Sequence, residues 1–205
     1  STKSRLIPGS GVNLEEHCFE DYPNDDKKIK FLFVGRVMQA KGIDELIIAS
    51  KKIKNEFPNV QFDIVGSIEE DYTDVLKKLE RENVIKYHGP QDDIHFYMKN
   101  SHAIINPSHH EGMSNVLLEA ASTGRPVIAS NIPGCRETFE DNVSGIGFEV
   151  KNAESLFDAI KKFIVLPYEV KKKMGITGRK KIEKEFDRNI VIDAYMDEIE
   201  KIIGG

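Results

Sequence analysis

The sequence predicts an α/β fold built on a doubly wound parallel sheet. Short runs of β-branched and aromatic residues alternate along the chain with longer segments whose apolar residues recur near the helical period. The short runs are largely apolar, which is typical of parallel strands covered by helices on both faces. In such a Rossmann-like sheet, ligands bind beyond the carboxyl ends of the strands. The loops after the strands are therefore the first place to look for a site.

The first half of the chain supplies three of these strands. Residues 29–34 (IKFLFV) predict a strand that stops at Gly35, and residues 43–57 predict a helix that Pro58 ends. Residues 60–65 (VQFDIV) predict a strand before Gly66. A helix over residues 71–83 and a strand over residues 84–88 complete this half.

The second half repeats the alternation. We expect a short helix at residues 92–99, a buried strand at 103–105, a helix at 115–123 and a strand at 126–129. A short strand at 145–150 and a helix at 154–165 follow. Pro167 suits the start of another helix, running to about residue 185. A last helix is expected at residues 188–203.

Composition limits the class of protein. The chain has 205 residues, 40% hydrophobic and 31% charged, with a net charge of −5, as expected of a folded globular domain that is not a general nucleic-acid binder. Its two cysteines are too few for a disulfide framework or a zinc site and favour the cytoplasm. No apolar run reaches the roughly 20 residues of a membrane span.

Two loops after strands carry charges that could bind an anionic ligand. Arg36 and Lys41 could hold a diphosphate, although their spacing alone also fits solvated surface cations. Glu111 and Glu119 flank the start of the helix predicted at 115–123, whose unpaired N–H groups suit a phosphate. An isolated Glu119 would more simply be a solvated helix charge.

These loops resemble a known family. The patterns are V-G-R-x-x-x-x-K-G at residues 34–42, Glu-Gly at 111–112 with a second glutamate eight residues after the first, G-R-P-V-I-A-S at 124–130 and G-x-x-E at 134–137. Together they resemble the retaining glycosyltransferases of the GT-B fold, in the large group 1 family. The resemblance runs from about residue 7 to residue 203 and covers only the C-terminal, donor-binding half of such enzymes.

The resemblance implies a reaction and a site. The reaction is transfer of a hexose or N-acetylhexosamine from a nucleoside diphosphate sugar, most often a UDP-sugar, to the hydroxyl of an acceptor sugar or lipid-linked saccharide. It proceeds without a metal and serves surface polysaccharide or glycoconjugate synthesis. Arg36 and Lys41 would hold the diphosphate, Glu111 the donor sugar and Glu119 the ribose, with Arg36, Lys41 and Glu111 as the catalytic residues. Backbone N–H groups would contact phosphate or sugar at Gly112, Met113, Ser114 and Asn115.

The resemblance also implies how the chain is divided. Residues 1–28 are expected to be an interdomain stub and polar linker from a missing N-terminal domain, and residues 29–187 the donor-binding domain. Residues 188–205 are expected to form a helix that packs back toward the missing domain. Because the resemblance places the acceptor site on that missing domain, the isolated domain is expected to turn over little or nothing. Basic clusters at 171–173 and 179–181 could touch the inner face of the cell membrane, or simply form a solvated helix face.

Other interpretations stay open at this stage. A non-catalytic nucleotide-binding module would keep Arg36 and Lys41 but show no sugar dependence. A doubly wound oxidoreductase is disfavoured because the Gly-x-Gly pairs at 9–11 and 145–147 lack the third glycine of the dinucleotide fingerprint. A metal at His109 and His110 has no evident third ligand.

Overall fold

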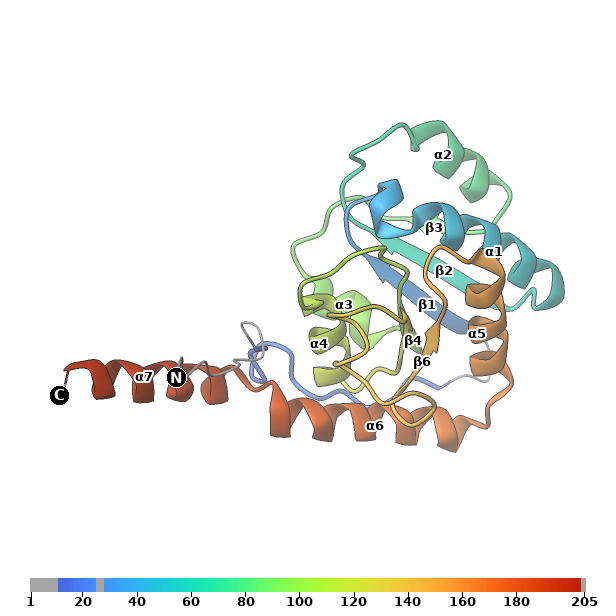
Figure 1. The fold of residues 1–205 in the computed structure, drawn as a ribbon. Coiled ribbons are helices and arrows are strands. Elements are labelled where there is room, and N and C mark those ends of the chain that lie inside the picture. The colour runs from blue at the N-terminus through green and yellow to red at the C-terminus, as the bar shows by residue number, and fades with distance from the viewer. Residues whose placement is uncertain (1–10, 25–27, 204–205) are drawn as a thin grey trace.

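The computed structural model describes residues 11–24 and 28–203. Its centre is a six-stranded, all-parallel sheet in the order β3-β2-β1-β4-β5-β6, with helices on both faces (Figure 1). This order places the topological switch point between β1 and β4, where a doubly wound sheet opens a crevice for ligands. The strands are β1 (Ile29–Val34), β2 (Val60–Val65), β3 (Lys86–Tyr87), β4 (Ala103–Asn106), β5 (Val127–Ser130) and β6 (Gly145–Phe148).

The helices confirm the predicted alternation, with ends that differ by a few residues. They are the 3-10 turn η1 (Gln39–Lys41) and the α-helices α1 (Ile43–Glu56), α2 (Thr73–Arg81), α3 (Ile94–Lys99), α4 (Asn115–Ser122), α5 (Ala153–Val165), α6 (Tyr168–Glu185) and α7 (Arg188–Ile203). The strand predicted at 84–88 is shorter than expected. The N–H of Val84 donates to Leu79 O and closes the end of α2, so it cannot extend the sheet.

The sheet buries a core on each face because successive strand residues point in opposite directions. Phe31 and Phe33 of β1 pack in the larger core, with α1, α2 and α5. Leu32, between them, packs in a second core with α3 and α4. A strand that is largely apolar therefore fits this layer arrangement, which confirms the reason for predicting a parallel sheet.

The segment predicted as a polar linker packs on the domain where it is described. Val12 donates its N–H to Phe186 O at 2.9 Å and accepts from Arg188 N at 3.0 Å, so the start of the described chain pairs with the start of α7. Tyr22 is 7% exposed, and its hydroxyl donates to His102 O at 2.9 Å. Residues 11–24 are thus part of the folded unit, because their apolar side chains and backbone groups find partners on it.

A buried arginine anchors this segment. Arg125 has no exposed surface, and its guanidinium donates to five backbone carbonyls at 2.8–3.3 Å. Two of them belong to the N-terminal segment, two to the end of α3 and one to the turn after α4. Burial lowers the pKa of Arg125 to about 10, which leaves it charged at neutral pH. The accepting carbonyls are those of Glu20, Asp21, Met98, Lys99 and Gly124.

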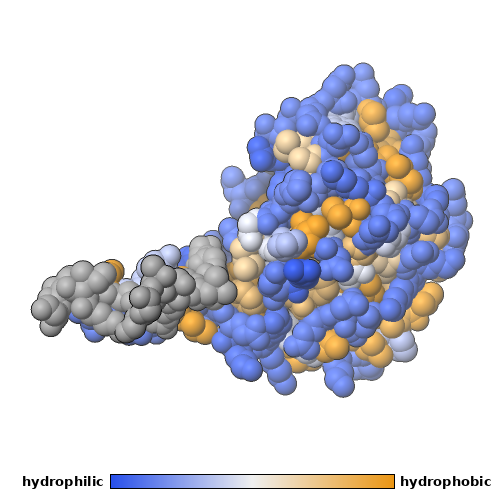
Figure 2. Space-filling view, viewed as in Figure 1, coloured by the Kyte–Doolittle hydropathy of each residue, from blue (hydrophilic) through white to orange (hydrophobic). Residues whose placement is uncertain are grey.

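The last helix, α7, extends away from the sheet (Figure 1). Its side chains at Ile192, Tyr195, Met196 and Ile199 are 45–55% exposed and recur at helical spacing, so they form one apolar stripe. Elsewhere the face of the domain seen in Figure 2 is mostly hydrophilic, with small hydrophobic areas. No helix among the described residues is both long and apolar enough to cross a membrane.

Three of the six residues in the two basic clusters of α6 contact other groups of the protein. Lys171 is 2% exposed, and its ammonium lies 5.8 Å from the centre of the Phe163 ring. Arg179 pairs with Glu183 and donates to Ser122 O, and Lys181 pairs with Glu185. These contacts leave fewer free cations on α6 than the sequence indicated, because Lys171 is buried and Arg179 and Lys181 form ion pairs within the helix.

Candidate functional site

The loops after β1 and β4 meet at the switch point of the sheet. Lys41, at the end of the β1 loop, places its Nζ 2.8 Å from Glu111 Oε1 in the β4 loop. The backbone holds the same junction, because His109 N donates to Ala40 O at 3.0 Å. The side chains of Lys41 and Glu111 are 25% and 16% exposed, so this ion pair is partly shielded from water. The structure therefore brings together two predicted site residues from distant parts of the sequence.

Gly42 allows the two loops to approach this closely. Its φ of +72° is in the left-handed region, and a Cβ at this position would lie 2.1 Å from Pro107 O. Any other residue would force the β1 and β4 loops apart. Gly42 also precedes α1, so the same residue sets the direction of that helix.

Arg36 adds a second cation at this edge. It follows Gly35 at the carboxyl end of β1, and its side chain is exposed. Among the described residues, its guanidinium forms no hydrogen bond or ion pair, whereas Lys41 is paired with Glu111. Arg36 is thus the free cation of the pair and the one able to bind an anion without breaking an internal contact.

The start of α4 offers unpaired backbone donors beside Glu111. Within the described chain, the N–H groups of Gly112, Met113, Asn115 and Val116 have no acceptor. A Cβ at Gly112 would meet nothing within 4 Å, so a ligand has room to approach this backbone. These groups and the helix dipole can stabilise negative charge.

Ser114 has a different role from the other residues predicted to offer backbone donors. Its N–H donates to Gly134 O at 2.8 Å, and its buried hydroxyl caps α4 by accepting from Leu117 N. Asn106 Nδ2 donates to the same hydroxyl at 2.7 Å. Ser114 fixes the helix start instead of offering a free donor, as a serine directly before a helix commonly does.

Glu119 lies beside the N-terminal segment. Its Oε1 lies 4.0 Å from His17 Nε2 of the N-terminal segment, while Glu111 pairs with Lys41. Burial, and secondarily the charge of Glu16, raises the pKa of Glu119 to about 7, against a smaller opposing effect of Arg188. Burial also lowers the pKa of His17. At neutral pH this carboxyl can both donate and accept hydrogen bonds, unlike an ordinary glutamate.

A partner of the loop that the sequence did not reveal is Glu45, in the first turn of α1. Its Oε1 lies 3.1 Å from His109 Nε2, and both side chains are at most 13% exposed. Glu45 Oε2 is buried without a hydrogen-bond partner. His109 is therefore held by α1, and the sequence carries no signal for this pairing because it needs the α1 and β4 loops to be adjacent.

A pocket of about 380 Å³ borders the loop. Glu111 lines it with His109 and His110, across from Ile132 and Pro133. A second pocket of about 380 Å³, near Arg136 and Glu149, includes none of the predicted site residues. Of these two pockets, the one at Glu111 contains a predicted site residue, whereas Arg36, Lys41 and residues 112–115 are not among its lining residues.

Two further residues of this region, Glu137 and Cys135, have structural roles. Glu137 Oε2 accepts from Gly134 N at 2.7 Å and so shapes the turn that supports the Glu111 loop. Burial, and then the charge of Glu111, raises the pKa of Cys135 to about 12. That thiol stays protonated and is no nucleophile. Among the described residues, the three-residue cluster of metal-ligand side chains lies elsewhere, at Cys18, Glu20 and His95.

Comparison with known proteins bears on the site as a whole. The family described as "Glycosyl transferases group 1" matches residues 15–181. The capsular polysaccharide biosynthesis glycosyltransferase CapM of Staphylococcus aureus is 29% identical over 193 residues, which cover 89% of this chain and 50% of that protein. The chain thus spans about half the length of this curated relative.

Solved structures share the fold. HepE of Anabaena in complex with UDP-glucose superposes with a TM-score of 0.80 at 19% identity, over 96% of this chain and 57% of that one. The C-terminal domain of the group 1 glycosyl transferase LpcC from Francisella tularensis superposes with a TM-score of 0.72 at 21% identity, over 86% of this chain and 99% of that one. The architecture is the Rossmann-like half of a GT-B fold, and the chain belongs to the group 1 glycosyl transferases.

Proposed function

We propose that this chain is the donor-binding, C-terminal half of a retaining glycosyltransferase that uses a UDP-sugar. The observation that carries the proposal is the clasp between Lys41 and Glu111 at the switch point of the sheet, beside the free cation of Arg36 and the unpaired N–H groups of α4. UDP is chosen because HepE, which shares the fold, was crystallised with UDP-glucose. The acceptor is a sugar or lipid-linked saccharide hydroxyl, and CapM points to surface polysaccharide synthesis.

The residues act by binding and by electrostatics. Loss of the nucleoside diphosphate is the demanding step, because negative charge builds on the leaving phosphate. Arg36, Lys41 and the start of α4 stabilise that charge without reorganising. Glu111 accepts hydrogen bonds from the sugar and is held in place by Lys41. Glu119, protonated for part of the time at neutral pH, hydrogen-bonds the ribose.

No covalent intermediate is part of the proposal. Glu111 is engaged by Lys41, and Cys135 is a protonated buried thiol, so neither is an activated nucleophile. Attack by the acceptor on the same face as the departing phosphate gives retention, with that phosphate accepting the acceptor's proton. A glycosyl-enzyme adduct found at any residue by mass spectrometry would contradict this step.

The other half of the enzyme is assigned to an N-terminal domain. The matched relative is about twice as long as this chain, and the exposed apolar stripe of α7 offers a surface for a second domain. The acceptor site is placed on that domain. We therefore expect this chain alone to bind UDP but to transfer sugar far more slowly than the two-domain enzyme.

Calorimetry tests the proposal directly. The purified chain is titrated with UDP, UDP-glucose, GDP, ADP and NADH, together with Arg36→Ala. Arg81→Ala is the matched control, because Arg81 is an exposed arginine at the C-terminal end of α2. We expect UDP binding that Arg36→Ala weakens and Arg81→Ala does not. Preference for NADH would overturn the proposal, and UDP binding that never responds to the attached sugar would favour a non-catalytic nucleotide-binding module.

A further inference from the structure

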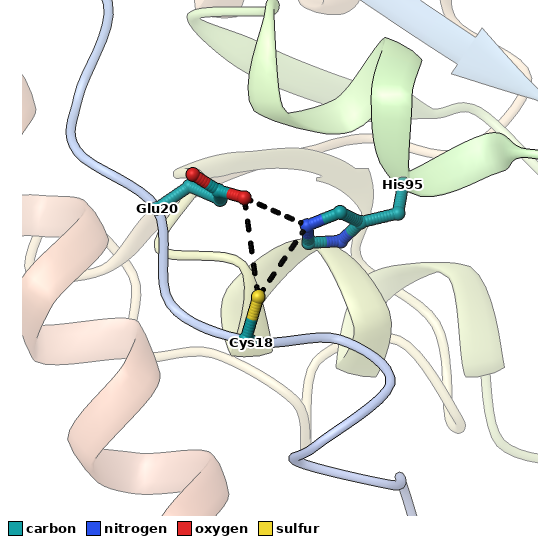
Figure 3. Close-up of side chains that lie close together, drawn as sticks. All are labelled: Cys18, Glu20 and His95. Carbon is teal, nitrogen blue, oxygen red and sulfur yellow. Dashed lines mark hydrogen bonds and ion pairs between the residues drawn. The ribbon is translucent and has the colours of Figure 1, made fainter.

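Three metal-ligand side chains converge at the junction of the N-terminal segment and α3. Cys18 and Glu20 come from the segment, and His95 from α3 (Figure 3). Cys18 Sγ lies 3.7 Å from His95 Nε2 and 3.9 Å from Glu20 Oε1, and His95 Nε2 lies 3.1 Å from Glu20 Oε1. A thiol, an imidazole and a carboxylate thus point at one another.

The triangle of ligand atoms has the size that zinc requires. Tetrahedral angles at the usual Zn–S, Zn–N and Zn–O distances place the sulfur about 3.6 Å from the nitrogen and about 3.5 Å from the oxygen, with nitrogen and oxygen about 3.3 Å apart. The observed edges of 3.7, 3.9 and 3.1 Å each differ little from these values. An ion would need only small side-chain adjustments.

The tautomer of His95 supplies a second argument. Thr123 Oγ1 donates its proton to Glu119 O at 2.9 Å, so toward His95 Nδ1, at 3.4 Å, it can only accept. The proton of a neutral His95 is then on Nδ1, and the lone pair of Nε2 faces the Glu20 carboxylate. The 3.1 Å contact between them is satisfied either by a proton, as in an imidazolium–carboxylate pair, or by a metal ion that both lone pairs bind. A metal-bound histidine usually donates its other ring N–H to an oxygen acceptor, and here the Thr123 hydroxyl is in that position.

The backbone holds the ligands in place without an ion. Glu20 N donates to Thr123 O, and Arg125 binds the carbonyls of Glu20 and Asp21. Cys18 is exposed, and the side chains of Glu20 and His95 are 34% and 19% exposed. An ion from solvent can therefore reach a preformed site and keep water as its fourth ligand.

We propose that Cys18 Sγ, Glu20 Oε1 and His95 Nε2 bind one Zn²⁺, with water as the fourth ligand. The thiol loses its proton to solvent as the Zn–S bond forms, and the ion joins the N-terminal segment to α3. This site is separate from the Lys41–Glu111 clasp. Counting cysteines missed it, because two of the three ligands are not cysteines and His95 lies 77 residues from Cys18 in the sequence.

Metal titration of the purified, chelator-treated chain tests the site. Zn²⁺ is titrated against a chromophoric chelator, and Co²⁺ is used as a spectroscopic probe. We expect one Zn²⁺ per chain, and for Co²⁺ the visible bands of a tetrahedral site with a thiolate charge-transfer band. Cys18→Ser and His95→Gln should each weaken Zn²⁺ binding by more than the roughly 10- to 100-fold typical of an outer contact. Glu20→Gln should weaken it too, and the control Glu15→Gln, an exposed glutamate of the same segment, should not.

Alkylation gives an independent readout that does not depend on the stability of a variant. N-ethylmaleimide should modify Cys18 in the metal-free chain and much less after Zn²⁺ is added, with buried Cys135 as the internal reference. Three results would each overturn the proposal: no Zn²⁺ binding at micromolar concentrations, an octahedral Co²⁺ spectrum without the thiolate band, or unchanged affinity in Cys18→Ser.

Discussion

Lys41 Nζ and Glu111 Oε1 lie 2.8 Å apart although 70 residues separate them in the sequence. They meet because β1 and β4 are neighbours in the sheet, and parallel strands present the loops after them at one edge. The pair joins a cation suited to phosphate to a carboxylate suited to sugar hydroxyls.

The two members of this pair should respond differently to substitution. Lys41→Ala removes a charge-assisted hydrogen bond worth about 1.5–3 kcal/mol, so we expect UDP to bind roughly 10- to 100-fold more weakly. Glu111→Gln leaves the ammonium in place and frees it, so UDP affinity should hold or rise. Calorimetry with UDP and UDP-glucose measures both. Equal loss of UDP affinity in the two variants would contradict the assignment of Lys41 to the phosphate and Glu111 to the sugar.

A second prediction uses two glycines of the same loops. Gly42→Ala combines a φ of +72° with a Cβ 2.1 Å from Pro107 O, and we expect it to lower the free energy of unfolding by about 2–4 kcal/mol. Gly112→Ala adds a methyl group to open space, so stability should change by less than about 0.5 kcal/mol. Urea unfolding distinguishes them.

Binding completes the comparison of these glycines. Gly112→Ala should weaken UDP-glucose binding despite normal stability, because the methyl group occupies the approach to the unpaired N–H groups of α4. A stable Gly112→Ala that binds the donor normally would place the ligand elsewhere.

The pKa of Glu119 predicts a pH dependence of stability. Its folded value of about 7 is above the ordinary 4.5, so between these values the folded chain holds a proton that the unfolded chain releases. The free energy of unfolding therefore falls as pH rises from about 4.5 to 7, by no more than about 3 kcal/mol. Glu119→Gln should remove this loss and gain stability relative to the parent at pH 8 but not at pH 4.5.

Melting temperatures across this range measure the effect. The exposed Glu15→Gln serves as the control and should follow the parent at each pH. A Glu119→Gln curve parallel to the parent curve would mean that the carboxyl titrates normally in the folded chain.

Arg125 predicts a stability effect far from the donor loops. A lysine has three donors on one nitrogen and cannot reach five carbonyls, so Arg125→Lys leaves buried acceptors unsatisfied. We expect a loss of about 3 kcal/mol or more in the free energy of unfolding by urea. Arg81→Lys should cost less than about 0.5 kcal/mol, because Arg81 is exposed and donates to a single carbonyl. Similar losses in both variants would contradict the anchoring part of Arg125.

The sequence predicted strand bounds best where a glycine directly follows the strand. The bounds of β1 and β2 agree with the prediction to the residue, because each is a largely apolar run that stops at a glycine. The edge strand β3 was predicted too long, since Val84 closes α2 instead. The apolar composition of residues 84–88 does not reveal whether a backbone N–H will bond to the neighbouring strand or to the end of the preceding helix.

In the candidate site, too, single residues could be predicted from the sequence, but their contacts could not. Sequence patterns pointed to Lys41 and Glu111 singly, but their contact depends on strand order, which no local pattern records. The pairing of His109 with Glu45 and the cluster around Cys18 also need distant segments to be adjacent. The assignment of Glu119 to ribose stays a prediction, and its neighbour His17 belongs to a segment that was expected to be linker.

The pairing of Val12 with Phe186 and Arg188 has a consequence for how the chain is made. A ribosome synthesises Val12 long before Phe186 and Arg188. Until Ile182 and Phe186 are made, the apolar side chains of Val12, Leu118 and Ala121 have no partner to cover them. We expect chaperones to bind nascent chains that stop short of residue 182 and to release those extended past residue 188 and clear of the exit tunnel. Crosslinking of stalled nascent chains would show whether release follows this length, and chaperone binding independent of length would refute it.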